Sequence, residues 1–170
     1  MHRLVLRTVV LLLATTVGAT LRAQAVEANS LRGIREIEVT IEPLATSAEE
    51  AGLHRADIQT DVELKLRLAG IKVLTNGEWL QGPGSPYLYV NANVRLNQPA
   101  APGLAIFSIS LQLKQLVTLT RDVSIMASAT TWDTEAAGSV GRTNLQKIRD
   151  GIRDLVDEFI NAYLSVNPKK

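Results

Sequence analysis

The sequence predicts an α+β protein: a two-layer sandwich in which a mostly antiparallel sheet of about five strands carries two helices on one face, in the order β-α-β-β-β-β-α. Two observations predict this class. Apolar residues recur with a period of two over most of the chain after residue 30, and with a helical period in two segments. Each long strand has one apolar and one polar face, whereas a sheet covered on both sides would consist of continuous apolar runs. Both helices are therefore expected on the same face.

The first 25 residues have the layout of a secretory signal peptide. Arg3 and Arg7 form a positive start, residues 8–21 carry no charge, and residues 23–25 (Ala-Gln-Ala) form a small-x-small cleavage site. The alternative is a membrane anchor, but the uncharged run has 14 residues and a spanning helix needs about 20. We expect cleavage after Ala25, a periplasmic or secreted protein, and no transmembrane segment after the signal is removed.

Composition excludes several classes of function. The chain has 170 residues, of which 46% are hydrophobic, 21% charged and 4% aromatic, and it has no cysteine. This excludes disulfides, thiolate metal sites, a cysteine nucleophile and a lipidated cysteine. Loss of the three signal arginines lowers Lys plus Arg from 18 to 15 against 17 acids, so the mature charge is −2. With no basic stripe, nucleic-acid binding is not expected.

The first half of the mature chain predicts a strand, a broken helix and a short strand. Residues 32–44 alternate apolar and polar residues, which predicts a half-buried strand. Ser47 and Glu50 fit a capping box for a helix over residues 47–69, which Gly52 interrupts, so that a second start lies near His54. Gly70 suits the position after a helix, residues 71–74 form a short strand, and residues 75–86 form a long loop.

Three strands joined by reversals come next. We expect them at residues 87–97, 105–119 and 123–132, the last two joined by a tight turn at Arg121 and Asp122, as successive antiparallel hairpins. Residues 133–141 are small, polar and contain glycine, which predicts a loop.

A helical period returns near the end of the chain. Residues 143–164 carry an apolar stripe that includes Leu145, Ile152 and Phe159, and Thr143 is the expected cap. Residues 26–167 should therefore form a single α+β domain, followed by a frayed tail at 168–170.

Few residues could support catalysis or metal binding. His54, Asp57 and Asp61 share a helix face, but a metal needs more ligands than this face offers. Asp133 and Glu135 could act as an acid–base pair if one were buried beside an apolar wall, for which Trp132 is adjacent. We favour a solvated surface for both groups and predict no catalytic residue, no metal ligand and no cofactor.

Four residues are candidates for binding a partner: Trp79, Leu80, Tyr89 and Trp132. Trp79 and Leu80 lie in the predicted loop over residues 75–86, where they either cover the end of the core or anchor a partner. Tyr89 and Trp132 fall on polar-face positions of predicted strands. Tryptophan and tyrosine often dominate interface energies, so this face is expected to be partly covered by something else.

Two stretches carry a resemblance. Residues 57–74 (DIQTDVELKLRLAGIKVL) and the end of the chain (ATTWDTEAAG, then IRDGIRDLVDEFINAYLSVNPK) look like small exported bacterial proteins of no assigned activity. In architecture, the domain is similar to periplasmic accessory domains of Tol, curli-secretion and lipopolysaccharide-transport assemblies. The resemblance implies an accessory role without chemistry. Those domains often carry a lipidated cysteine, which this chain lacks.

We therefore predict a non-catalytic exported binding or assembly protein whose partner is another cell-envelope protein or a second copy of itself. Two alternatives stay open. One is a small carboxylate-dependent hydrolase that uses Asp133 and Glu135, and the other is a structural protein that associates with itself through an edge strand.

Overall fold

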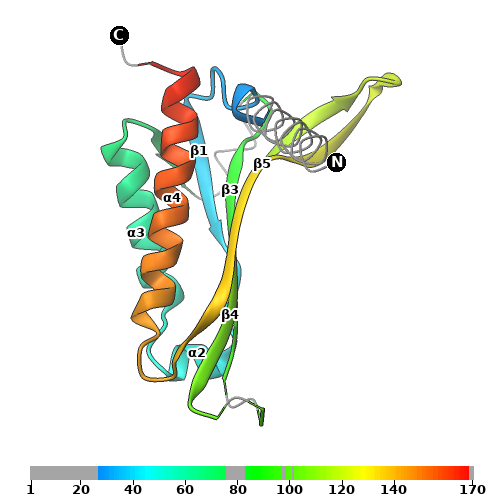
Figure 1. Cartoon of the computed structure of the whole chain (residues 1–170). Helices are drawn as coiled ribbons and strands as arrows, with labels where there is room; N and C mark the ends of the chain where they lie inside the picture. Colours follow the sequence, from blue (N-terminus) through cyan, green and yellow to red (C-terminus); the bar gives the residue numbers. More distant parts are fainter. Residues whose placement is uncertain (1–26, 76–82, 97–98, 101, 169–170) are drawn as a thin grey trace, which may run out of the picture.

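The computed structural model describes residues 27–75, 83–96, 99–100 and 102–168. In this part of the chain a five-stranded sheet has the order β2-β1-β3-β4-β5. The strands are β1 (Glu36–Ile41), β2 (Lys72–Leu74), β3 (Tyr87–Arg95), β4 (Leu104–Leu119) and β5 (Asp122–Gly141). The helices are α2 (Thr46–Glu50), α3 (Arg55–Leu68) and α4 (Gln146–Val166). Figure 1 shows α3 and α4 side by side on one face of the sheet, which confirms the predicted two-layer class.

The long ladders of the sheet are antiparallel. β3 pairs with β4, and β4 with β5, as the predicted hairpins require. β1 lies between β2 and β3 and pairs in parallel with both, but over short stretches. A parallel neighbour needs a crossover, and α3 supplies it between β1 and β2. The outer halves of β4 and β5 bend away from the helical layer as a projecting hairpin (Figure 1).

The core lies between the helices and the apolar face of the sheet. β1 alternates buried and half-buried positions along its length, and β3 does so over most of its length. The α4 stripe is buried at Ile148, Ile152, Leu155, Val156 and Phe159. α4 sits close to β4, because a Cβ added to Gly151 would lie 3.1 Å from Ile109 Cδ1. Every residue classed as buried in the described part is apolar, as expected for a core without an internal polar network.

The helices begin and end where the backbone conformation changes, and not at residues whose side chains cap them. The break between α2 and α3 lies at Gly52, with a φ of 95°, as predicted. Gly70, with a φ of 88°, follows α3, and the Ile71 amide donates to the Leu66 carbonyl at 3.0 Å in a Schellman arrangement. The predicted side-chain caps are wrong.

Ala45 precedes α2 and Leu145 precedes α4, and neither makes a side-chain capping bond. Ser47 lies inside the first turn of α2 and so cannot be the cap of that helix. Thr143 lies two residues before Leu145, the residue that precedes α4.

The predicted loop over residues 133–141 is wrong, because β5 continues to Gly141. β5 finds a pairing partner in β4 along almost the whole length of β4. In the part of β5 after the bulge, the pairs run from Leu113 opposite Trp132 to Leu104 opposite Gly141. The small residues that indicate a loop have a packing role here. A Cβ on Gly138 would lie 3.3 Å from Phe107 Cζ, so the glycine makes room for the ring beside it.

Candidate functional site: the polar face of the sheet

The face of the sheet opposite α3 and α4 is the candidate site, and we call it the polar face. In the described part of the chain, the helices packed on the sheet lie on its other side (Figure 1). Successive side chains of a strand point to opposite faces of the sheet, so alternate residues along β1, β3, β4 and β5 lie on the polar face. These residues are Glu36, Glu38, Thr40, Glu42, Tyr87, Tyr89, Asn91, Asn93, Arg95, Ser108, Ser110, Gln112, Lys114, Asp133 and Glu135.

The strand register aligns this polar face in rows. Thr40 pairs with Tyr89, Tyr89 with Gln112, and Gln112 with Asp133, so one row crosses four strands. The next row carries Asn91, Ser110 and Glu135. Hydrogen-bonding groups of several kinds therefore stand within reach of one another on an open surface.

Tyr89 is held at the centre of the polar face. Its hydroxyl donates to Glu42 Oε2 at 2.5 Å, and the Asn91 side-chain amide donates to the same oxygen. The Lys114 ammonium lies 4.5 Å from the centroid of the Tyr89 ring, within cation–π range. The hydrogen bond to the Glu42 carboxylate is the main cause of a raised pKa of Tyr89, because it stabilises the neutral phenol. The ring is thus a fixed, neutral, half-buried aromatic.

Trp132 does not lie on the polar face, so this sequence prediction is wrong. Its side chain is 7% exposed, and its ring meets that of Phe159 edge-on with centroids 5.2 Å apart. The cause is a bulge: Leu113 pairs with Trp132 but Lys114 pairs with Thr130, which leaves Thr131 as an extra residue. One extra residue reverses the alternation, so Trp132 turns toward α4.

Trp79 and Leu80 lie outside the described residues, and their partner-binding role stays a prediction.

Asp133 and Glu135 stand on the polar face, with both side chains exposed. They are opposite Gln112 and Ser110. A carboxylate acting as a general acid is usually desolvated by an apolar wall. The expected wall, Trp132, points to the other side of the sheet. The structure therefore gives this pair no such environment.

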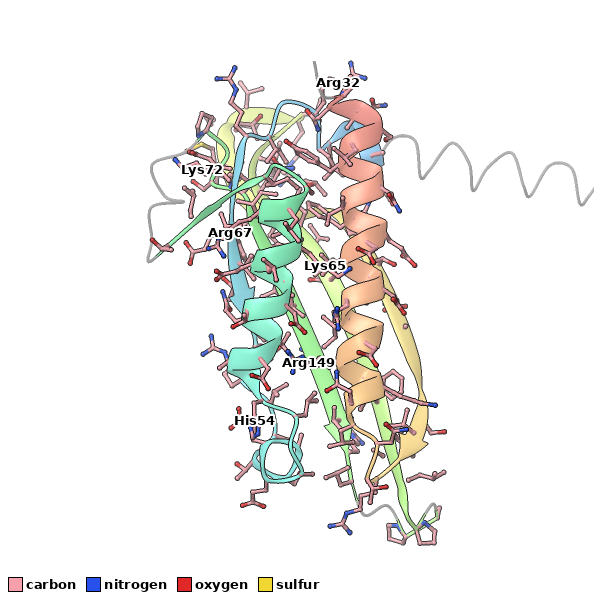
Figure 2. The ribbon with its side chains drawn as sticks, turned by 90° about the vertical axis from the view of Figure 1, so that its left-hand side faces the viewer. Arg32, His54, Lys65, Arg67, Lys72 and Arg149 are labelled. Carbon is pink, nitrogen blue, oxygen red and sulfur yellow. The ribbon has the colours of Figure 1, made fainter. Side chains whose placement is uncertain are left out.

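The third predicted cluster, His54, Asp57 and Asp61, is partly engaged by a cation that the sequence analysis missed. Arg149 of α4 donates from Nε to Asp61 Oδ2 at 2.6 Å and from Nη2 to Asp61 Oδ1 at 2.9 Å. It also reaches Asp57 Oδ2 at 3.2 Å. Figure 2 shows Arg149 between the two helices and His54 at the start of α3.

The Arg149 guanidinium lowers the pKa of Asp61, chiefly through this hydrogen bond. The two aspartates therefore connect α3 to α4. Among the described residues, no group of three His, Cys, Asp or Glu side chains comes together as a metal site would require.

A cavity of about 670 Å³ lies at the other edge of the sheet, between β1 and α3. It exists because β2 is short and pairs only with residues 36–38 of β1. The open carbonyls farther along β1 are capped instead by side chains of α3: Arg55 Nε donates to Ile41 O at 2.8 Å, and Gln59 Nε2 to Val39 O at 3.2 Å. Arg55 and Gln59 therefore satisfy β1 carbonyls that β2 does not reach. We assign them this structural role and no chemical one.

No helix in the described part of the chain is both long and apolar enough to cross a membrane.

Comparison with known proteins yields structural neighbours that share little sequence identity with the chain. No family model and no curated protein matches the chain. Among solved structures, a dodecamer of a single-residue variant of PelC from Paraburkholderia phytofirmans is 17% identical, with a TM-score of 0.45 over 78% of this chain and 90% of that one. The rare lipoprotein B from Shewanella oneidensis is 11% identical, with a TM-score of 0.30 over 75% of this chain and 91% of that one.

Proposed function

We propose that the protein is a non-catalytic exported accessory protein that binds a cell-envelope partner through the polar face. The observation that carries this proposal is the arrangement around Tyr89: an aromatic ring fixed by Glu42 and Lys114 at the centre of a sheet surface on which no described helix packs. A rigid aromatic among hydrogen-bonding groups is well suited to an interface, because little conformational entropy is lost on binding.

The chemistry of the site favours binding over catalysis. The candidate acid–base pair, Asp133 and Glu135, is exposed to water. His54 lies at the start of α3, a helix of the opposite layer, so it cannot complete a catalytic group on the polar face. What remains is a surface of amides, hydroxyls and carboxylates, which recognise a partner by hydrogen bonds.

The charge of the polar face indicates what kind of partner fits. Three cations stand on it, Arg95, Lys114 and, at the β2 edge, Lys72, whose Nζ lies 3.0 Å from Glu36 Oε2. Against them stand five carboxylates: Glu36, Glu38, Glu42, Asp133 and Glu135. Such a surface repels phosphate backbones and attracts a protein surface that carries lysine or arginine. An envelope protein with a basic patch is the partner that we propose.

Trp79 and Leu80 are proposed as a second contact for the same partner. If Trp79 is an anchor, Trp79→Ala keeps its urea midpoint but loses the copurifying partner. If Trp79 covers the core, the midpoint falls by the equivalent of about 3 kcal/mol or more and association is unchanged.

A crosslinked pull-down from the cell envelope tests the polar face directly. Tyr89→Ala should lose the captured protein, since it removes the fixed ring and leaves Glu42 without its hydroxyl donor. Leu68→Ala is the matched control, because Leu68 is 74% exposed on α3, in the opposite layer. Equal capture by both variants, at equal urea midpoints, would remove the polar face as the binding surface.

A further inference from the structure

A hollow of about 140 Å³ borders the polar face where β1 ends and β3 continues, and its lining consists of Glu42, Pro43, Ala45 and residues 91–94. β1 ends at Ile41, and Pro43 has no N–H with which to extend the ladder. In the described part of the chain, no strand pairs with the last residues of β3 on the β1 side. A water molecule takes about 30 Å³ of the liquid, so the hollow has room for several of them or for one small polar group.

Hydrogen-bond acceptors line the hollow. The Glu42 carboxylate is held at its wall by the Tyr89 hydroxyl and the Asn91 side-chain amide, which both donate to Oε2. The Val90 carbonyl accepts from the Glu42 amide at 2.9 Å. Because alternate residues of a strand direct their backbone groups to the same edge, the Ala92 carbonyl points toward the hollow that follows.

The Glu42 carboxylate has no cation from its own chain. Glu42 is half-buried, and among the described residues no lysine or arginine forms an ion pair with it. Lys114 contacts the Tyr89 ring instead, and Arg95, farther along β3, is exposed and does not line the hollow. A partly desolvated carboxylate of this kind favours a positive group supplied by another molecule.

The distribution of acceptors favours a guanidinium over an ammonium. The Asn93 side chain adds an amide oxygen to the Glu42 carboxylate and the Ala92 carbonyl. A guanidinium is planar and carries five N–H donors in a fixed fork, whereas an ammonium is a compact, strongly hydrated charge. Acceptors at separate positions around one hollow therefore suit the fork.

We propose that this hollow binds an arginine side chain of the envelope partner, with the guanidinium paired to Glu42. The inference rests on the proposed function, because Glu42 joins the hollow to the Tyr89 ring at the centre of the polar face. It names the side chain through which a basic patch of the partner is recognised.

A nuclear magnetic resonance titration of residues 26–170 with N-acetyl-arginine amide tests the site without knowledge of the partner. The amide signals of Asn91 and Asn93 should shift saturably, with a Kd of about 1–10 mM for a single side chain. N-acetyl-citrulline amide, which keeps the shape and has no charge, should not bind. N-acetyl-lysine amide should bind about threefold or more weakly than the arginine probe.

Two variants and a matched control locate the binding. Glu42→Gln should weaken arginine binding about tenfold or more, because it removes the charge and keeps an oxygen for the Tyr89 hydroxyl. Asn93→Leu should weaken it without a change of charge. Glu36→Gln, the same change at the other end of β1 where Lys72 pairs with Glu36, should leave the Kd unchanged. Absence of saturable shifts, equal binding of the citrulline probe, or equal effects of the two glutamate variants would each overturn the proposal.

The envelope pull-down separates this inference from the proposed function. Capture lost with both Tyr89→Ala and Glu42→Gln would support both. Capture lost with Tyr89→Ala but kept with Glu42→Gln would overturn the arginine site and leave the polar face as the binding surface. Saturable binding of the arginine probe, with capture unchanged by Tyr89→Ala, would support the guanidinium site and remove the polar face as the partner's surface.

Discussion

The ring of Trp132 meets the ring of Phe159 edge-on, with centroids 5.2 Å apart and planes at 71°. This contact joins β5 to α4, and it forms because the bulge at Thr131 turns Trp132 into the core. Edge-to-face pairs add about 0.5–1.5 kcal/mol beyond the apolar area they bury. The pair therefore connects the base of the projecting hairpin to the helical layer.

Replacing either ring should be costly. Phe159→Ala and Trp132→Ala should each lower the free energy of unfolding by about 3–5 kcal/mol through lost burial and a cavity. Lys147→Ala, on the exposed side of α4, should change it by no more than about 0.5 kcal/mol. Urea denaturation measures all three. Equal midpoints for Phe159→Ala and Lys147→Ala would contradict the orientation of α4.

The Arg149–Asp61 pair should make stability depend on pH. Arg149→Met should lower the free energy of unfolding by about 1–2 kcal/mol at pH 7, because it removes a charge-assisted hydrogen bond. The value is at the lower end of the range because the pair is partly exposed to water. The folded pKa of Asp61 lies below the unfolded value of about 3.9. The pair therefore stabilises the fold above about pH 4, and this contribution disappears as the pH falls through the folded pKa.

Arg153→Met is the matched control for Arg149→Met. Arg153 is 47% exposed and lies 3.7 Å from Asp150, so its loss should cost no more than about 0.5 kcal/mol. Urea titrations at several pH values distinguish the two. A deficit of Arg149→Met that stays constant down to pH 2 would show that the pair acts through packing rather than charge.

Gly70 should be intolerant of a side chain. Its φ of 88° closes α3, and Gly70→Ala should cost about 1 kcal/mol. Gly141→Ala is a matched control, because nothing lies within 4 Å of an added Cβ there and its φ is not in the left-handed region. Thermal unfolding of the two variants compares them. A neutral Gly70→Ala would contradict the Schellman end of the helix.

Export predicts a defined mature N-terminus. Residues 1–25 should be removed, so that N-terminal sequencing of protein released by osmotic shock reads from Val26. An intact Met1 in a membrane pellet would show that the segment is retained.

Periodicity predicted much of this fold because it records which face of each element is buried. The alternation of β1 and β3 and the stripe of α4 all follow from one apolar side. The continuation of β5 past Trp132 has no such local signal. It depends on a partner strand that pairs Ala136 with Ile109 and leaves Gly138 beside Phe107.

The candidate site was predictable only in part, for the same reason. The orientation of Tyr89 follows from counting along one strand. That of Trp132 depends on a bulge, which exists only once β4 and β5 are in register. The Arg149–Asp61 pair depends on how α3 and α4 rotate against each other, and the pattern of either helix alone does not specify that.

The most direct test of the central claim is photo-crosslinking in living cells from the middle of the polar face. A photoreactive residue at Gln112, which stands between Tyr89 and Asp133 in one row, should give a light-dependent adduct with one envelope protein. The same residue at Lys147, on the exposed side of α4, is the control. The photoreactive residue at Gln112 should give an adduct that Tyr89→Ala abolishes, and the one at Lys147 should give none. An adduct from Lys147 with none from Gln112 would contradict it.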